Sequence, residues 1–505
     1  MDPLKCNAAV AVVGAGAMGA GIAQVVAQAG HPVRLLDQSP GAAARAVATI
    51  DQRLARQVAK GRLDEASRQA IHGRLQPVEH LHELRDSALV IEAIAENLAA
   101  KQQLFAELEA LCTDDCILAS NTSSLSITAL AAGLRRPQRL LGLHFFNPAP
   151  LMALVEVVPG LASDPGIVQC LHQTLLDWGK QPVRARSTPG FIVNRVARPF
   201  YGESLRLLQE GAADCATLDA LLREAGGFAM GTFELTDLIG QDINDRVTCS
   251  IYEAYYADPR FQPSLIQQEL VAAGHLGRKS GQGFYSYAEG AQRPPIQQLH
   301  SNAKISDCVL EGDLAWAMPL VQRLEQRGIQ VLRRDGPGLL RVGDAVLVPS
   351  DGRLASQRAR DSGQGNLVLL DLAADYQQAT RLAISCNAGI QPHALDQAVA
   401  LLQQAGLQVS RLSDTPALAV LRTVAMLANE AADALLQGVA SAADIDLAMR
   451  LGVNYPLGPL AWAERLGLGH LLQVLENLQG AYGEDRYRPS LLLRRRVAEG
   501  RNLHD

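Results

Sequence analysis

Short apolar runs alternate with helical stretches along the first part of the chain. The strand candidates are rich in β-branched side chains, and their sequences are AVAVVG, HPVRLLD, ALVIEAIAE, CILASN, RLLGLHFF and LMALVEVV. Strands that alternate with helices are typical of a parallel, doubly wound sheet. Residues from about 40 to 75 show helical periodicity without a strand candidate, which predicts a helical excursion from that sheet.

The pattern changes beyond Thr188, where long amphipathic segments such as IVNRVARPFYGESLRLLQE and LIQQELVAAG follow one another. They predict an all-α domain that closes with GRKSGQGFY at Tyr285. The stretch AEGAQRPPIQQ, with Pro294 and Pro295, indicates a linker. Short strand candidates then return between residues 306 and 412 (IQVLRR, AVLVP, NLVLLDLA and RLAIS), with no glycine-rich phosphate loop after the first of them. They predict a reduced α/β fold without a nucleotide site.

The last segment repeats the helical domain at a constant offset of 227 residues. The matching pairs are Thr188-Pro189 with Thr415-Pro416, Gly211 with Gly438, Asp219 with Asp446, Gly231 with Gly458, and Gly240 with Gly467. Five matches at one offset indicate an internal duplication. The chain is also longer than one core supports, so we expect four domains, at residues 1–187, 188–287, 288–412 and 413–505.

A phosphate-binding loop is predicted at the start of the first sheet. In VVGAGAMG, the residues Gly14, Gly16 and Gly19 form G-x-G-x-x-G directly after a strand candidate and before a helix. The glycines permit a tight turn, a close approach of backbone to a pyrophosphate, and close helix packing. Asp37 ends the next strand candidate, where a carboxylate binds both ribose hydroxyls and repels a 2′-phosphate. The first domain is therefore a predicted Rossmann-type NAD site.

Composition and charge exclude several other classes of protein. The net charge of −6 comes from basic and acidic residues mixed along the chain, which offers no binding surface for nucleic acid or an anionic membrane. We find no run of about 18 apolar residues and no cleavable leader, so we expect a cytoplasmic protein. The eight cysteines are scattered without a C-x-x-C pair, so neither a metal site nor a disulfide framework is expected.

Three longer motifs carry a family resemblance: SNTSSLSIT (120–128), GLHFFNPAPLMALVEV (142–157) and TPGFIVNR (188–195). They closely resemble the 3-hydroxyacyl-CoA dehydrogenases, over about residues 8–285. The resemblance implies NAD-dependent oxidation of a (3S)-3-hydroxyacyl-CoA to the 3-oxoacyl-CoA, and the family's catalytic residues map onto Ser123, His144, Glu156 and Asn194.

The chemistry itself asks for such a set of residues, because hydride transfer from an alcohol carbon requires a base for the hydroxyl proton. His144 can accept that proton near neutral pH, and Glu156 would fix the imidazole tautomer and stabilise the imidazolium. Ser123 and Asn194 would hydrogen-bond the 3-oxygen and the thioester carbonyl of the substrate.

The resemblance implies further contacts. Glu96, Lys101, Asn121 and Asn147 resemble contacts to the nicotinamide side of NAD, although Glu96 and Lys101 could instead form an exposed helix pair. Basic residues of the helical excursion could meet the CoA phosphates or simply form a solvated face; they are Arg53, Arg56, Lys60 and Arg62.

The second copy departs from the first at the site. Leu421 stands where the repeat places Asn194, and Pro416-Ala417-Leu418 replaces Pro189-Gly190-Phe191. Leucine cannot hydrogen-bond a substrate oxygen, so we expect one active site and a second copy that only packs. Two smaller departures are Thr232, where the family usually has proline, and the absence of a GRKSGQGFY tail from the repeat.

Alternatives remain open at this stage. A class of short-chain 3-hydroxyacid dehydrogenases uses a lysine four residues before an asparagine, but here that position is Gly190. A non-enzymatic NAD-binding role, as in related lens proteins, conflicts with the intact catalytic set. The long form resembles bacterial dehydrogenases of phenylacetate catabolism that oxidise 3-hydroxyadipyl-CoA, and 3-hydroxybutyryl-CoA is the alternative substrate. Arg186 or Arg198 could meet a terminal carboxylate. A homodimer is expected, unless the repeat occupies that surface and leaves a monomer.

Overall fold

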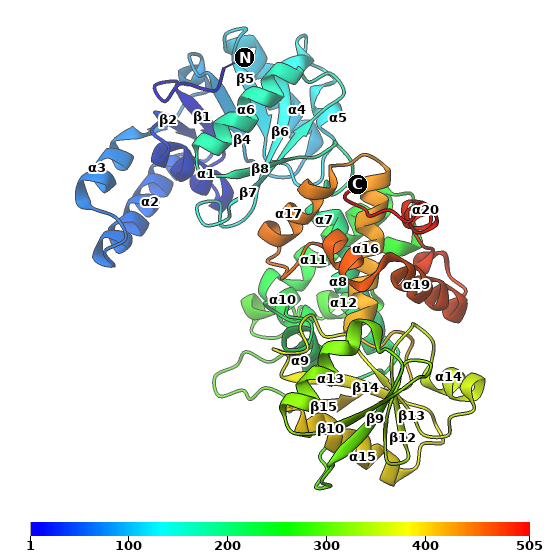
Figure 1. Cartoon of the computed structure of the whole chain (residues 1–505). Helices are drawn as coiled ribbons and strands as arrows, with labels where there is room; N and C mark the ends of the chain where they lie inside the picture. Colours follow the sequence, from blue (N-terminus) through cyan, green and yellow to red (C-terminus); the bar gives the residue numbers. More distant parts are fainter. Residues whose placement is uncertain (1) are drawn as a thin grey trace. The chain divides into compact units, whose positions relative to one another are not determined.

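The computed structural model describes residues 2–505. Its backbone divides into two compact units, one of residues up to Arg195 with Gln437–Val453 and one of Val196–Leu436 with Asn454–Asp505 (Figure 1). The chain thus leaves the first unit at Val196 and returns to it for 17 residues of the second helical copy. Within residues 2–505, no helix is both long and apolar enough to cross a lipid bilayer.

The first unit contains an eight-stranded sheet in the order β3-β2-β1-β4-β5-β6-β7-β8. Neighbouring strands are parallel except β6 and β7, which are antiparallel. The strands are β1 (Val10–Val13), β2 (Val33–Leu36), β3 (Leu75–Val78), β4 (Leu89–Glu92), β5 (Ile117–Ser120), β6 (Leu140–Phe145), β7 (Leu154–Pro159) and β8 (Gln181–Arg184). This confirms the predicted doubly wound α/β fold.

Helices cover both faces of this sheet, which is why its central strands are continuously apolar and buried. The helices of this unit are α1 (Ala17–Gln28), α2 (Ala42–Ala59), α3 (Glu65–Arg74), α4 (Leu98–Leu111), α5 (Ile127–Ala131), α6 (Pro165–Asp177) and α17 (Ala442–Gly452), and the short helix α7 (Val193–Val196) ends at the first residue of the second unit. Helices α2 and α3 pack together as a hairpin that extends beyond the sheet (Figure 1).

Helix α17 belongs to the repeated sequence, yet it packs against β7 and β8 of the first unit. A Cβ atom on Gly452 would lie 2.8 Å from Leu154 Cδ2 and 3.0 Å from Val193 Cγ2. The end of α17 therefore needs glycine to approach the strand that carries Glu156.

Two strands of the first sheet escape the apolar pattern, and both are edge strands. Strand β3 reads LQPV and β8 reads QPVR, each with an internal proline. An edge strand pairs on one side only, so proline and polar residues are tolerated there.

The second unit contains a mixed seven-stranded sheet in the order β10-β9-β11-β12-β13-β14-β15. Its strands are β9 (Asp307–Glu311), β10 (Gln330–Arg334), β11 (Leu339–Val342), β12 (Ala345–Pro349), β13 (Leu367–Leu370), β14 (Arg381–Cys386) and β15 (Gln408–Arg411), and its helices are α13 (Met318–Gln326), α14 (Ala355–Ser362) and α15 (Pro392–Gln404). The reduced α/β fold is confirmed, although β9, β11 and β15 were not among the sequence candidates.

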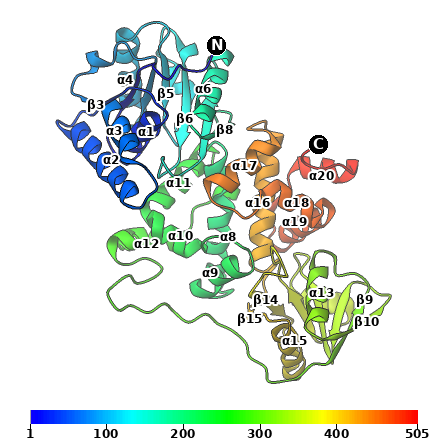
Figure 2. The same ribbon diagram turned by 60° about the vertical axis from the view of Figure 1, so that its left-hand side comes forward.

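The remaining helices of the second unit form two related sets. The first is α8 (Arg198–Gln209), α9 (Cys215–Glu224), α10 (Thr232–Ile239), α11 (Gln241–Ala254) and α12 (Leu265–Ala272), and the second is α16 (Val420–Leu436), α18 (Pro459–Leu466), α19 (Leu468–Tyr482) and α20 (Leu491–Glu499). Helices α16 and α8 pack along each other (Figure 2). Gly231 and Gly458, one repeat apart, cap the N-termini of α10 and α18.

Candidate active site

The glycine loop between β1 and α1 is shaped for a phosphate group. A Cβ atom on Gly14 would lie 2.4 Å from the Ala93 carbonyl oxygen, and one on Gly19 would lie 1.8 Å from that of Gly14. On Gly16, by contrast, it would meet no atom of residues 2–505 within 4 Å. Gly16 is also the N-cap of α1, whose first turn has no acidic residue. The helix N-terminus is thus open to an anion, and the loop fits a dinucleotide pyrophosphate.

Asp37 lies beside this loop at the end of β2. Its Oδ2 accepts a hydrogen bond of 2.7 Å from the backbone N–H of Ala15, and its Oδ1 accepts one of 2.8 Å from Ser39. Because β1 and β2 are parallel neighbours, their carboxyl ends meet at one edge of the sheet. The carboxylate is therefore held where the ribose of a dinucleotide would lie when its phosphates contact α1.

His144 and Glu156 form a buried pair on neighbouring strands. The antiparallel register of β6 and β7 places them directly opposite each other, and His144 Nδ1 lies 2.6 Å from Glu156 Oε2. His144 is 6% exposed and Glu156 is fully buried. An ionised carboxylate accepts only, so Nδ1 carries a proton and the Nε2 atom of the neutral imidazole is left as an acceptor.

The other oxygen of Glu156 binds the start of helix α7. Oε1 accepts hydrogen bonds from the backbone N–H groups of Ile192 (2.9 Å) and Val193 (3.0 Å). Asn194, which is half-buried, is the next residue of this helix. Glu156 thus connects the imidazole to the backbone segment that carries Asn194.

Two aromatic rings contact the imidazole of His144. The ring centroid of Phe146 lies 4.5 Å away and that of Phe191 lies 5.8 Å away. Phe191 adopts a left-handed backbone conformation (φ 47°) just before α7. The backbone therefore turns sharply between the aromatic contact and the helix that carries Asn194.

Glu96 organises the loop that carries Ser123. It accepts hydrogen bonds from the Thr122 hydroxyl (2.6 Å), the Ser123 backbone (3.0 Å) and the Ser124 hydroxyl (2.9 Å). Burial opposes ionisation of this carboxyl group, but Lys101 and the hydroxyl donors outweigh it and lower the pKa of Glu96. Glu96 is therefore an anion that holds the loop in place.

Lys101 is 1% exposed and lies between two carboxylates. Its Nζ donates to Glu92 Oε1 at 2.6 Å and lies 3.1 Å from Glu96 Oε2. Glu92 also accepts from the Ser120 hydroxyl at 2.6 Å. Lys101 is therefore buried and is not part of the exposed helix pair that the sequence analysis gave as an alternative. Glu92, an acid inside the apolar run ALVIEAIAE, was overlooked, although its position in that run was a signal.

The remaining predicted site residues lie in three different settings. Asn121 Oδ1 accepts from the backbone N–H of Phe145 at 2.8 Å, so it ties β5 to β6 beside His144. Asn147 is exposed. The basic residues Arg53, Arg56, Lys60 and Arg62 are all exposed on α2 or just beyond its end.

A doubly wound sheet with an open glycine loop, an acid after its second strand and a buried His–Glu pair defines an NAD-dependent dehydrogenase. Residues 9–188 match the NAD-binding domain of 3-hydroxyacyl-CoA dehydrogenase, and residues 190–287 and 419–504 match its C-terminal domain. Residues 347–416 match the reduced Rossmann-fold domain of 3-hydroxybutyryl-CoA dehydrogenase. The chain belongs to the 3-hydroxyacyl-CoA dehydrogenase family, with NAD as its cofactor.

Relatives along the whole length support this assignment. The 3-hydroxyadipyl-CoA dehydrogenase of Escherichia coli K12 is 46% identical over 97% of both chains. The crystal structure of a 3-hydroxybutyryl-CoA dehydrogenase from Escherichia coli K12 is similar at a TM-score of 0.90, with 45% identity, and covers 98% of this chain and 99% of that one. An (S)-3-hydroxybutyryl-CoA dehydrogenase from Ralstonia eutropha is 38% identical at a TM-score of 0.54 and covers 55% of this chain and 98% of that one.

Proposed function

We propose that the protein oxidises a (3S)-3-hydroxyacyl-CoA with His144 as the base that accepts the hydroxyl proton. The supporting observation is the 2.6 Å contact between His144 Nδ1 and the buried Glu156 carboxylate. NAD, when bound, supplies the hydride acceptor. The alcohol proton goes to Nε2 of His144, and the resulting imidazolium is stabilised by the carboxylate that it contacts.

The surroundings of Glu156 keep it available for this role. Two backbone N–H groups at the start of α7 bind its other oxygen and fix the direction of the carboxyl group. Since the carboxylate already points at Nδ1, little reorganisation accompanies the appearance of charge on the ring.

Ser123 and Asn194 complete the proposed substrate contacts, to the 3-oxygen and the thioester carbonyl. Glu96 and Lys101 are also among the proposed NAD contacts. Their proposed effect on NAD binding is exerted through the loop that carries Ser123, which they hold in place. Asn121 keeps its amide N–H group for donation, because its oxygen is used by Phe145. Asn147 is exposed and remains a proposed direct contact.

The exposed basic face of α2 is the proposed site for the CoA phosphates. Arg53 and Arg56 are three residues apart on this helix, so their side chains lie on one side of it, and Lys60 follows directly after its last residue, Ala59. These exposed cations can meet the phosphates of CoA.

The acyl group is proposed to be 3-hydroxyadipyl, because the full-length relative of that name is 46% identical. The role in phenylacetate degradation stays a prediction from the sequence. The similar crystal structure carries the name of a 3-hydroxybutyryl-CoA enzyme, so the shorter acyl group is the second candidate. The homodimer and the cytoplasmic location remain predictions.

The test is NADH formation at 340 nm with 3-hydroxyadipyl-CoA and with 3-hydroxybutyryl-CoA, each at saturating NAD. We expect turnover of both and a higher kcat/KM for the adipyl substrate. A protein that binds NAD but oxidises neither thioester would overturn the proposed function. A higher kcat/KM for 3-hydroxybutyryl-CoA would overturn only the choice of acyl group.

A further inference from the structure

Five side chains at the carboxyl ends of β4 and β5 form a closed hydrogen-bond network. Glu92 and Ser120 are the last residues of these strands, and Glu92 accepts from the Ser120 hydroxyl at 2.6 Å. Lys101 Nζ donates to Glu92 Oε1 at 2.6 Å and lies 3.1 Å from Glu96 Oε2. Glu96 accepts from the Thr122 hydroxyl at 2.6 Å, and the Thr122 N–H donates to Ser120 Oγ at 3.3 Å, which closes the network. These five residues are named the Glu92 network.

Both carboxyl groups of the Glu92 network are anions. Ser120 Oγ accepts the Thr122 N–H, so its own proton is directed at Glu92 Oε2. The other oxygen of Glu92 accepts from Lys101 and from a backbone N–H group, so both oxygens act as acceptors, as in an ionised carboxylate. Glu96 is the second anion, because burial is outweighed by Lys101 and the hydroxyl donors, which lower its pKa.

The Glu92 network therefore has one negative charge in excess. Lys101 contacts both carboxylates, and within residues 2–505 no other cation forms an ion pair with either of them. Glu92 and Ser120 are fully buried, and Lys101 and Thr122 are each 1% exposed. The positive N-terminal end of α4 offsets only about half a charge. Since a buried charge is unfavourable unless it is compensated, the network gains from a cationic ligand.

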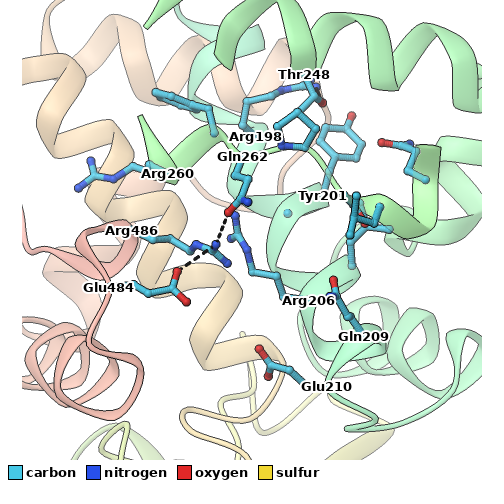
Figure 3. A pocket seen from close by; sticks show the side chains of 17 residues that line it. Arg198, Tyr201, Arg206, Gln209, Glu210, Thr248, Arg260, Gln262, Glu484 and Arg486 are labelled. Carbon is cyan, nitrogen blue, oxygen red and sulfur yellow. Dashed lines mark hydrogen bonds and ion pairs between the residues drawn. The ribbon is translucent and has the colours of Figure 1, made fainter. Parts of the chain in front are cut away.

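A cavity of about 480 Å³ in the second unit shows the opposite situation (Figure 3). Arg486 in its wall donates to Gln262 Oε1 at 2.7 Å and lies 3.0 Å from Glu484 Oε2 (Figure 3). Two further arginines of the wall are also paired, Arg206 with Glu203 and Arg260 with Glu430 and Asp433. These three cations have their counterions in the protein, whereas the second carboxylate of the Glu92 network has none of its own.

The strand order places the Glu92 network beside the glycine loop. Val13, which precedes Gly14, is the register partner of Glu92, and a Cβ atom on Gly14 would lie 2.4 Å from the Ala93 carbonyl oxygen. Asp37 lies on the other side of β1, just after β2. A dinucleotide bound where the strand order reverses spans both sides of β1. With its adenosine ribose at Asp37, its nicotinamide half is directed to β4 and β5.

The two redox states of the cofactor differ in charge at this end. The nicotinamide ring of NAD⁺ is positively charged, and that of NADH is neutral because the hydride brings two electrons. A nearby excess of negative charge therefore stabilises bound NAD⁺ relative to bound NADH.

We infer that Glu92 determines the preference of the site for the oxidised cofactor, because its carboxylate gives the Glu92 network its excess negative charge. The same preference favours the release of NADH after the alcohol has been oxidised. The inference depends on NAD binding to the first unit and not on the proposed role of His144, so the two can fail separately.

The test is the ratio of the dissociation constants of NAD⁺ and NADH, measured by calorimetry on the full chain without a thioester. Glu92→Gln keeps the shape of the side chain and removes its charge. It should weaken NAD⁺ binding about fivefold to tenfold and leave NADH binding within about twofold of wild type. A general distortion of the site would instead weaken the binding of both forms.

Two further variants complete the experiment. Glu96→Gln removes a charge from a more exposed member of the network, so it should shift the ratio in the same direction by a smaller factor. It also provides the test if Glu92→Gln fails to fold. Glu109→Gln is the matched control, because Glu109 is a buried carboxylate near the other end of α4 that binds backbone N–H groups. It should leave the ratio unchanged.

A ratio that changes in the network variants but not in Glu109→Gln supports the inference. Affinities that fall together at a constant ratio overturn it and leave the network as a scaffold. A shift of the ratio towards NAD⁺ in Glu92→Gln, or an equal shift in the control, overturns it as well. If the ratios change as expected but wild type oxidises no 3-hydroxyacyl-CoA, the inference is supported and the proposed function fails. A wild-type protein that binds neither form of the cofactor overturns both.

Discussion

Glu156 and Asp371 each bind the first N–H groups of a helix, and the two helices are related by the 227-residue repeat. Glu156 accepts from Ile192 and Val193 at 2.9 and 3.0 Å. Asp371, just after β13, accepts from Ala419 and Val420 at 3.0 and 2.9 Å. The same pairs of N–H groups, one repeat apart, thus meet a buried carboxylate from the α/β sheet of their own unit.

The two copies differ in what the second oxygen of the carboxylate contacts. In Glu156 it faces the imidazole of His144, whereas in Asp371 it accepts two more backbone N–H groups, from Leu372 and Leu421. The difference teaches that the carboxylate at the helix start is a structural device common to both copies. Only Glu156 leaves one oxygen for a side chain that can take a proton, and this is where we propose that the catalytic chemistry takes place.

Amide substitutions at the two carboxylates should separate these roles most strongly. Glu156→Gln removes the charge that stabilises the imidazolium and should lower kcat by a factor of about 10²–10⁴. Asp371→Asn should leave kcat within about twofold and lower the melting temperature, because an amide N–H₂ then faces backbone donors. Steady-state NADH formation and thermal unfolding measure the two effects. Equal losses of kcat would contradict the comparison.

Asn194 and Leu421, which occupy equivalent positions in the two copies, provide the next test. Asn194→Ala should lower kcat/KM by a factor of about 10²–10³, as expected for loss of a donor to a substrate oxygen. Leu421 is fully buried, and Leu421→Ala should instead lower the free energy of unfolding by about 2–5 kcal/mol. Denaturant unfolding beside steady-state kinetics separates the outcomes. A kinetic loss from Leu421→Ala as large as that from Asn194→Ala would argue for two active sites.

The two sheets should also differ in nucleotide binding. Only the first sheet has the open glycine loop with Asp37 beside it, so calorimetry should show one NAD per chain. Asp37→Ala should weaken NAD binding about tenfold through loss of the ribose contacts. A stoichiometry of two, or unchanged affinity in the variant, would contradict the assignment of the nucleotide site to the first sheet.

The smallest expected effect is a pH dependence of stability that arises from Asp371. Burial raises the pKa of Asp371 to about 6, although its backbone donors oppose the rise. The folded state therefore binds this proton more tightly than the unfolded chain, and stability must fall as pH rises from about 4 to 6, by at most about 1.4 kcal/mol per pH unit. Urea unfolding at several pH values should show a shallower slope for Asp371→Asn. An identical slope would refute this role of Asp371.

Much of the first unit could be predicted from the sequence because its central strands are apolar and its glycine loop has a defined spacing. The partnership of His144 and Glu156 was implied by the family resemblance and agrees with the chemistry of the two side chains, but their contact follows from the antiparallel register of β6 and β7, which no local pattern encodes. The edge strands β3 and β8 were missed because one-sided pairing leaves their sequences polar.

Long-range packing explains the remaining differences between the predictions from the sequence and the structure. Lys101 was a candidate surface residue by its helical spacing to Glu96, and its burial depends on Glu92 from a separate strand. Asp371 had no motif around it. Its role depends on a helix that begins about fifty residues later in the chain.

The central claim is that the His144 imidazole, held by Glu156, accepts the alcohol proton. The most direct measurement is kcat of His144→Gln at saturating NAD and 3-hydroxyacyl-CoA, together with the NAD dissociation constant. We predict a fall in kcat by a factor of about 10²–10⁴ with unchanged NAD affinity, since the loss of a general base affects the chemical step. A kcat within threefold of wild type, with the protein folded, would contradict the account.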